Sequence, residues 1–333
     1  MTPPLSILDL AIVGAGESVS ESLAGCVAVA RRAEELGYRR VWYAEHHNMA
    51  AIASSATSVL IAHVAAHTEH IRLGSGGIML PNHSPLTIAE QFGTLAALHP
   101  GRIDLGLGRA PGTDQITLRA LRRDGRAAET FPQDVVELQG FLGDETRIPG
   151  VEATPGKGTH VPLYILGSSL FGAELAGLLG LPFAFASHFA PQALIDAVAI
   201  YRRSFRPSAQ LDAPYAIVGV NVIAADSDAD AQEQLQITRR ARVQRFFSRG
   251  GQPLTDAEAD ALLRSPQAAH VDEMLRYTAC GTPDAVAAYL DELAATVEAD
   301  ELMTVHQTST RAGRIRSVEL TAVAVGLDTA PAC

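Results

Sequence analysis

The feature that most restricts the fold is a regular alternation of short apolar runs with longer segments of helical periodicity. The apolar runs are nearly continuous, as expected for parallel strands that are covered on both faces. Such alternation is typical of α/β proteins, and eight strand–helix units predict a closed (β/α)8 or TIM barrel rather than an open sheet. The eight expected strands are residues 5–13, 40–45, 71–80, 103–108, 163–166, 183–187, 215–225 and 302–307.

Two connections are longer than a barrel needs, residues 111–160 after the fourth strand and residues 226–300 after the seventh. We interpret both as insertions into one domain that spans residues 1–333, because no linker or internal repeat divides the chain. Residues 248–270, within the second insertion, are rich in glycine, proline and charge. We expect this stretch to form a mobile lid over the strand ends, with little of it in the core.

Composition excludes several classes of function. The chain has 26 Lys and Arg against 37 Asp and Glu, a net charge of −11, so we expect it to bind neither nucleic acid nor an anionic membrane. Lys157 is the only lysine, which argues against Schiff-base chemistry. The cysteines, Cys26, Cys280 and Cys333, form no CxxC pair, so no disulfide framework or cysteine zinc site is indicated. Without a recognisable signal peptide or membrane-spanning run, we expect a cytoplasmic protein.

In TIM barrels, chemistry occurs at the carboxyl ends of the strands. The histidine pair His46–His47, at the end of the second expected strand, is the most prominent feature there. Three histidines together with Glu45 could ligate zinc, but we would expect a metal site in a barrel to have carboxylates on several strands. A second pair, His63 and His67, has helical spacing but lies on an outer helix, so we expect no metal site. The strand-end residues that we expect to line a substrate pocket are Asp9, Asn48, Ser187 and His188.

A phosphate site is indicated at the fifth strand end, where Gly167-Ser168-Ser169 precedes a helix. Free N–H groups and the positive end of the helix dipole favour an anion at such a position. Arg109, at the neighbouring strand end, would add a charge-assisted hydrogen bond. The competing interpretation is that Ser169 is an ordinary N-cap. The glycines from Gly106 to Gly112 have the spacing GxGxxxG, which is a weak match to a dinucleotide fingerprint.

Several motifs, taken in order, resemble the bacterial luciferase-like flavin-dependent monooxygenases. The resemblance is strong from about residue 5 to residue 225 and thinner beyond, and it is greatest for the single-chain, homomeric bacterial members. The segments that carry it are WYAEHHN at 42–48, GSGGIMLP at 74–81, AEQF at 89–92, PGRIDLGLGR at 100–109, GSS at 167–169 and GLP at 180–182.

The resemblance implies roles for individual residues. The family's catalytic histidine falls on His46, and its non-proline cis peptide beneath the flavin ring falls between Gly76 and Gly77. The phosphate-binding arginine falls on Arg109, and the backbone from Ala110 onward would lie against the isoalloxazine.

The phosphate-binding pair at the fifth strand falls on Ser168 and Ser169. Three positions depart from luciferase itself: Ser168 stands in place of a glutamate, Gly172 in place of a phosphate-binding threonine, and Ser187 in place of a tryptophan. Gly172 would keep only its N–H for the phosphate, and the substrate face would differ from that of a light-emitting enzyme.

The function that the resemblance implies is a two-component monooxygenase. It would use FMN, reduced by a separate flavin reductase, together with O2 on a small organic substrate. The alternatives are a deazaflavin-dependent reductase that transfers hydride, and a non-catalytic FMN-binding flavoprotein. We also expect a homodimer through the helices at residues 54–67 and 84–98, because both are apolar nearly all round.

Overall fold

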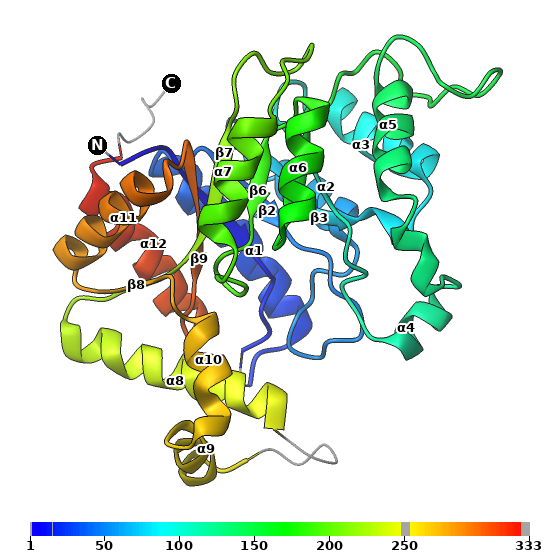
Figure 1. Ribbon diagram of the computed structural model, residues 1–333. Coiled ribbons are helices and arrows are strands. Elements are labelled where there is room, and N and C mark those ends of the chain that lie inside the picture. The colour runs from blue at the N-terminus through cyan, green and yellow to red at the C-terminus, as the bar shows by residue number, and fades with distance from the viewer. Residues whose placement is uncertain (1, 15, 248–253, 328–333) are drawn as a thin grey trace.

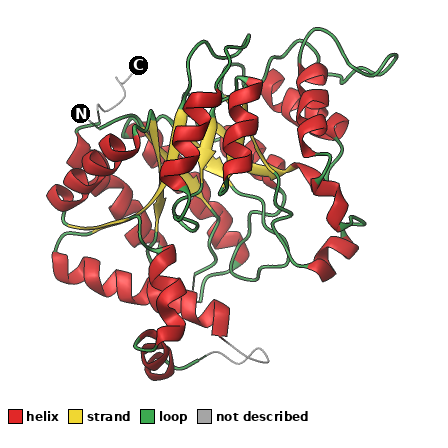
Figure 2. Ribbon diagram, in the orientation of Figure 1, coloured by secondary structure: helices red, strands yellow, loops and turns green. Residues whose placement is uncertain are grey.

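The computed structural model describes residues 2–14, 16–247 and 254–327. Eight parallel strands form a closed barrel, in which β6 pairs with β7 and β1 pairs with β9 (Figure 1, Figure 2). The predicted TIM barrel is therefore confirmed. The barrel strands are β1 (Leu5–Asp9), β2 (Arg40–Tyr43), β3 (Arg72–Met79), β4 (Ile103–Gly108), β5 (Leu163–Gly167), β6 (Phe183–Phe185), β7 (Ala216–Ala224) and β9 (Glu301–His306).

Helices surround the barrel and bury one face each against it. Local signals fix their ends: Ser18 and Glu21 form a capping box before the first helix, and Ser84 caps the third, which has Pro85 in its first turn. Gly180, with φ of 63°, ends the sixth in the left-handed conformation. The surrounding helices are α1 (Val19–Glu35), α2 (Thr57–Ala65), α3 (Pro85–Leu98), α5 (Phe131–Leu142), α6 (Leu170–Leu179), α7 (Leu194–Ser204), α11 (Pro283–Val297) and α12 (Arg311–Val325).

A ninth strand, β8 (Thr278–Gly281), was not predicted. It pairs with the second half of β7, from Asn221 to Ala224, whereas the three-residue strand β6 reaches only as far as Val218. Strand β8 thus pairs with the part of β7 that the short strand β6 leaves open. A run of four residues, only half of them buried, is too short to stand out from a polar insertion in the sequence.

The first part of each insertion lies beyond the carboxyl ends of the strands, on the lower side of Figure 1, whereas the later parts return along the outside of the barrel as α5 and α11. The first insertion contains α4 (Gln115–Ala120) and the 3-10 helix η2 (Gly125–Ala128); the 3-10 helix η1 (Leu80–Asn82) directly follows β3. The second begins with the long helix α8 and continues through shorter helices. These are α8 (Asp228–Phe247), α9 (Asp256–Leu263), the 3-10 helix η3 (Pro266–Ala268) and α10 (Ala269–Met274).

The expectation that little of residues 248–270 belongs to a core is wrong for the part that is described. Ala259, Leu263 and Ala268 pack with Val243 of α8 and Val271 of α10 in a small hydrophobic cluster of their own. The pattern was missed because the cluster needs α8 as its second layer. Residues 248–253 lie outside the described residues, and movement of this segment as a lid stays a prediction.

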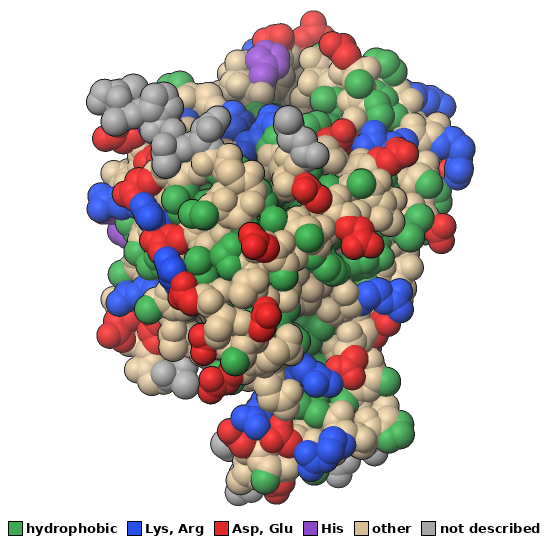
Figure 3. Space-filling model, turned by 90° about the vertical axis from the view of Figure 1, so that its left-hand side faces the viewer, with side chains coloured by type: hydrophobic (Ala, Val, Ile, Leu, Met, Phe, Trp, Pro, Cys, Tyr) green, Lys and Arg blue, Asp and Glu red, His purple; other side chains and the backbone are tan. Residues whose placement is uncertain are grey.

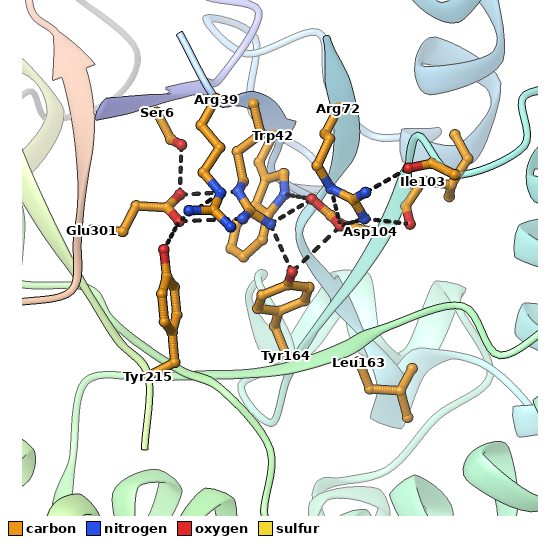
Figure 4. Close-up of polar contacts among 12 residues, drawn as sticks. Ser6, Arg39, Trp42, Arg72, Ile103, Asp104, Leu163, Tyr164, Tyr215 and Glu301 are labelled. Carbon is orange, nitrogen blue, oxygen red and sulfur yellow. Dashed lines mark hydrogen bonds and ion pairs between the residues drawn. The ribbon is translucent and has the colours of Figure 1, made fainter. Parts of the chain in front are cut away.

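A buried charge network fills the opposite, amino-terminal end of the barrel (Figure 4). The Arg40 guanidinium donates to Asp104 at 2.7 Å, to the Tyr164 hydroxyl at 2.7 Å and to Glu301 at 3.2 Å. Glu301 also accepts hydrogen bonds from Ser6 and Tyr215. Because these side chains occupy that end of the barrel, the carboxyl ends of the strands are the place to search for a ligand site.

The face in Figure 3 carries acidic and basic side chains interspersed among apolar ones. Within the described ranges, no helix is both long enough and apolar enough to span a membrane.

Candidate active site

His46 follows β2 at the carboxyl end of the barrel. Its backbone N–H donates to the Ser54 carbonyl at 3.2 Å, which fixes the start of the loop. Its side-chain Nδ1 is buried and has no hydrogen-bond partner among the described residues. Burial lowers the pKa of His46, and the nearby positive charge of Arg245 lowers it further. The result is a neutral imidazole with a free nitrogen, the form that can accept a proton near neutral pH.

The adjacent His47 has a different environment. Its Nε2 lies 2.9 Å from the buried carboxylate of Glu45, which is also 2.9 Å from Nε2 of His83 and accepts the Met79 N–H at 3.0 Å. Burial alone would raise the pKa of Glu45, but the hydrogen bonds from His47 and His83 outweigh it and lower the pKa to about 2. The same bond to Glu45 raises the pKa of His47. Glu45 is therefore a charged anchor for this loop.

The peptide bond between Gly76 and Gly77 is cis, as the sequence resemblance implied. These two glycines lie where the pairing of β3 with β4 shifts register, between Ser75 and Ile78. A Cβ atom on Gly76 would lie 2.6 Å from Leu8 Cδ1, and one on Gly77 would lie 2.7 Å from the Gly106 carbonyl oxygen. A side chain at Gly77 would meet backbone, and one at Gly76 would require Leu8 to move, so close packing favours glycine at both positions.

The predicted phosphate site is brought together at the ends of β4 and β5. The Arg109 guanidinium lies over the ring of Phe171, 4.3 Å from its centroid, and Phe171 is in the first turn of α6. Among the described residues, no carboxylate is within ion-pair distance of Arg109. Ser169 stands at the N-cap of α6, but its side chain makes no capping bond, which argues against the N-cap interpretation. An arginine, a hydroxyl and unpaired helix N–H groups form a set that fits a phosphate dianion.

The remaining flavin-contact candidates lie beside this set. Ser168 and Ala110 are exposed next to Ser169 and Arg109, respectively. Gly172 is buried in α6, where a Cβ atom would come within 3.5 Å of the Phe183 ring.

His188, after β6, is the second imidazole at the mouth. Its Nδ1 is buried without a hydrogen-bond partner among the described residues, and its carbonyl accepts from Asn221 Nδ2 at 2.8 Å. Burial lowers its pKa to about 3, and the charges of Arg242 and His46 act in the same direction. His46 and His188 are therefore near enough to affect each other's protonation.

The other three residues expected to line a substrate pocket have protein partners instead. Asp9 is buried and accepts from the Ala11 N–H at 2.8 Å and from Arg314 at 2.9 Å. Ser187 is fully buried and donates to the Gly219 carbonyl at 2.5 Å. Asn48 is exposed in a turn and donates to Asp114 at 3.2 Å. Proximity to a strand end could not show that these side chains form hydrogen bonds within the fold. Oδ2 of Asp9, however, is buried without a partner among the described residues.

The described part of the chain contains no group of three or more His, Cys, Asp or Glu side chains arranged to hold a metal ion. His63 on α2 and His67, two residues after the end of that helix, are both exposed, and their rings lie edge to face with centroids 4.7 Å apart.

Together, these features define a TIM-barrel protein with a buried imidazole, His46, and an arginine, Arg109, at the carboxyl end of its barrel. The model of the luciferase-like monooxygenase family matches residues 4–299, and the chain belongs to that family. It is thus an oxidoreductase of the luciferase-like monooxygenase family.

The similarity to known proteins extends over nearly the whole chain. The uncharacterized protein YvbT of Bacillus subtilis (strain 168) is 50% identical over 326 residues, 96% of this chain and 95% of that protein. A luciferase-like monooxygenase of Escherichia coli (strain K12) is 47% identical over 321 residues, 96% of either chain. The crystal structure of apo-MsnO8 has 35% identity and a TM-score of 0.87, and covers 98% of this chain and 100% of that one.

Proposed function

We propose that this protein is an FMN-dependent monooxygenase that receives reduced FMN from a separate reductase and uses O2 to oxidise a small organic substrate. The observation that carries the proposal is the cradle of Arg109, Ser169 and the first turn of α6, which has an unpaired cation and an unused hydroxyl at the barrel mouth. These groups match a terminal phosphate such as that of FMN.

The choice between flavins rests on relatives, because solved proteins with this fold use both kinds. One is the oxygenating constituent of a type II Baeyer–Villiger monooxygenase in complex with FMN, at 16% identity and a TM-score of 0.71. Another is an F420-dependent secondary alcohol dehydrogenase, at 15% identity and a TM-score of 0.71. Nearer relatives favour oxygenation: the Escherichia coli relative bears the name monooxygenase, and an N-acetyl-S-alkylcysteine monooxygenase of Bacillus subtilis is 42% identical over 187 residues.

When bound, reduced FMN supplies the two electrons with which O2 delivers one oxygen atom to the substrate and the other to water. The chain itself binds and orients the flavin. Arg109 and Ser169 hold the phosphate, and the backbone at Gly76 and Gly77 accommodates the ring. His46 holds or accepts a proton at its free Nδ1, a role that suits its lowered pKa at neutral pH.

A titration of the protein with FMN, reduced FMN and deazaflavin, followed by absorbance, tests the proposal. We expect reduced FMN to bind, and we expect its oxidation by O2 to change when it is bound to the protein. Binding of deazaflavin without FMN would instead support the hydride-transfer reductase. Binding of FMN with no effect of any organic compound on the consumption of O2 or on the products formed would support a non-catalytic flavoprotein.

A further inference from the structure

Helix α8 crosses the carboxyl end of the barrel and carries four arginines whose surroundings differ. Arg239 pairs with Asp272 at 2.7 Å, and Arg240 pairs with Asp260 at 2.6 Å, so these two fasten α10 and α9 to α8. Arg242 and Arg245 make no ion pair with any residue that the structure describes. Nε of Arg242 is also buried without a hydrogen-bond partner there. Two of the four cations therefore lack a counter-charge among the described residues.

Hydrogen bonds hold this part of α8 against the strand ends. The hydroxyl of Thr238, one turn before Arg242, lies 3.2 Å from the carbonyl of Gln307 after β9 and 2.9 Å from the carbonyl of Gln234 in α8, and it donates to one or shares its proton between the two. The Gln307 amide donates to Asn221 in β7 at 3.2 Å, and Asn221 donates to the carbonyl of His188 after β6 at 2.8 Å. The position of Arg242 is thus tied to the ends of three barrel strands.

Arg245 contacts the loop that follows His46, and the charges of Arg245 and Arg242 act on the two unpartnered imidazoles. Nη2 of Arg245 lies 3.3 Å from the sulfur of Met49, three residues after His46. The positive charge of Arg245 lowers the pKa of His46, and that of Arg242 lowers the pKa of His188. Burial lowers the pKa of Arg242 itself to about 10, and the charge of Arg245 adds to this effect. The positive charges of the two arginines thus favour the neutral form of both imidazoles.

Arg242 is partly buried, and a cation there without a counter-charge is costly, so a bound anion would offset the cost; Arg245 is exposed. Arg242 and Arg245 are three residues apart, so they lie on the same face of α8 and can contact one anionic group. The flavin phosphate does not need them, because the Arg109 cradle lies at the ends of β4 and β5. An anion bound at Arg242 and Arg245 would therefore be different from the flavin phosphate.

We propose that Arg242 and Arg245 bind a carboxylate or sulfonate of the organic substrate and hold it beside His46 and His188. This inference rests on the proposed function in one respect, namely that the bound anion is the compound to be oxidised. It narrows the substrate class to small organic anions and makes Arg242 and Arg245 specificity-determining residues.

Binding to the flavin-free, full-length protein provides the test, with calorimetry on matched pairs of probes. The pairs are hexanoate with hexanamide, benzoate with benzamide, and hexane-1-sulfonate with hexan-1-ol. In the wild-type protein we expect at least one anion to bind tenfold or more tightly than its neutral partner, which corresponds to one charge-assisted hydrogen bond. Arg242→Gln and Arg245→Gln should each remove most of that preference and leave the neutral probe unchanged. Arg239→Gln, on the same helix but paired with Asp272, is the control and should keep the preference.

The proposal is overturned if no anion is preferred by the wild-type protein, or if the preference survives in both variants. It is also overturned if Arg242→Gln and Arg245→Gln weaken FMN binding as much as anion binding, because the arginines would then serve the flavin. The proposed function is tested by a separate measurement, FMN binding to the wild-type protein. Its failure can be distinguished from failure of this inference, because the anion measurement requires no flavin.

Discussion

His46 and His47 are neighbours in the chain but have opposite electrostatic surroundings. Burial and Arg245 lower the pKa of His46, whereas the bond to Glu45 raises the pKa of His47. The first histidine has a free nitrogen at the mouth, and the second is part of the fold. Their substitutions should therefore affect different properties.

Replacement of His46 by Ala should lower substrate oxidation by about 10²- to 10⁴-fold, the usual contribution of a general acid or base. The affinity for FMN should stay nearly unchanged, because phosphate contacts dominate it. His47→Ala is the matched control and should instead lower the free energy of unfolding by about 1–3 kcal/mol, because Glu45 loses a hydrogen-bond donor. Single-turnover kinetics with reduced FMN and O2, together with urea unfolding, measure both. Wild-type turnover in His46→Ala would remove the catalytic assignment.

His306 predicts a pH dependence of stability. Its ring is buried, with Nε2 3.1 Å from Oγ1 of Thr304 and Nδ1 2.9 Å from Oγ of Ser317. Burial lowers the pKa of His306 from 6.5 to about 3. Between these values the unfolded chain binds a proton that the folded protein does not, so stability falls as the pH falls below 6.5. The loss is about 1.4 kcal/mol per pH unit for one such group.

Chemical unfolding at pH 6.5 and pH 5 tests this dependence in the wild-type protein and in His306→Gln. His188 and His46, whose pKa values are also lowered, contribute with the same sign, and His47, whose pKa is raised, contributes with the opposite sign. The His306→Gln variant should therefore lose part of the pH dependence and keep the rest. Glu45 contributes mainly below pH 4.5 and does not disturb this interval. An equal pH dependence in both proteins would contradict the assignment.

At the scale of elements, the buried network at the amino-terminal end holds several strands together through one cation. Arg40 of β2 pairs with Asp104 of β4 and with Glu301 of β9, and both carboxylates are fully buried. Removal of the guanidinium leaves two buried charges short of a partner. Arg40→Ala should therefore destabilise the protein by about 3–5 kcal/mol.

The matched control is Arg39→Ala. Arg39 also lies near Glu301, at 3.8 Å, but its side chain is 45% exposed. This change should cost less than about 1 kcal/mol, as is usual for exposed ion pairs. Urea unfolding of the two variants compares them directly. Equal losses of stability would mean that the buried network does not hold the barrel end together.

The eight barrel strands could be predicted because parallel strands covered on both faces are continuous apolar runs. The same rule missed β8, whose four residues alternate between buried and half-buried. At the site, the strand-end rule found His46, Arg109 and Ser169. It could not find Arg242 and Arg245, because they lie on a helix of the second insertion. Only the pairing of Arg239 and Arg240 with aspartates singles out the two arginines that remain, and that pairing requires the structure.

At the scale of the whole molecule, most apolar side chains of helices α2 and α3 are buried against the rest of the protomer. Leu60, Ile61 and Phe92, which are among the residues that make these helices apolar nearly all round, are buried within the protomer. Val59 and Leu98 stay 67% and 65% exposed on these neighbouring helices. The homodimer stays a prediction, and the apolar surface available for it on α2 and α3 is smaller than expected, with Val59 and Leu98 at its centre.

We expect a dimer in light scattering at micromolar concentration, and we expect Val59→Glu with Leu98→Glu to give a folded monomer. Two charges at the centre of an interface lose their hydration there, whereas on a free surface they cost little. Circular dichroism confirms that the double variant is folded. A wild-type monomer, or a dimer that persists in the double variant, would exclude this interface.

The most direct test of the central claim compares FMN with riboflavin, which lacks the phosphate, in the wild-type protein and in Arg109→Ala. If the cradle at α6 binds the phosphate, Arg109→Ala weakens FMN binding by about 10- to 100-fold and leaves riboflavin binding nearly unchanged. The exposed arginine Arg119 on α4 provides the control, and Arg119→Ala should bind both flavins like the wild-type protein. Equal weakening of FMN and riboflavin in Arg109→Ala, or no preference of the wild-type protein for FMN, would contradict the account.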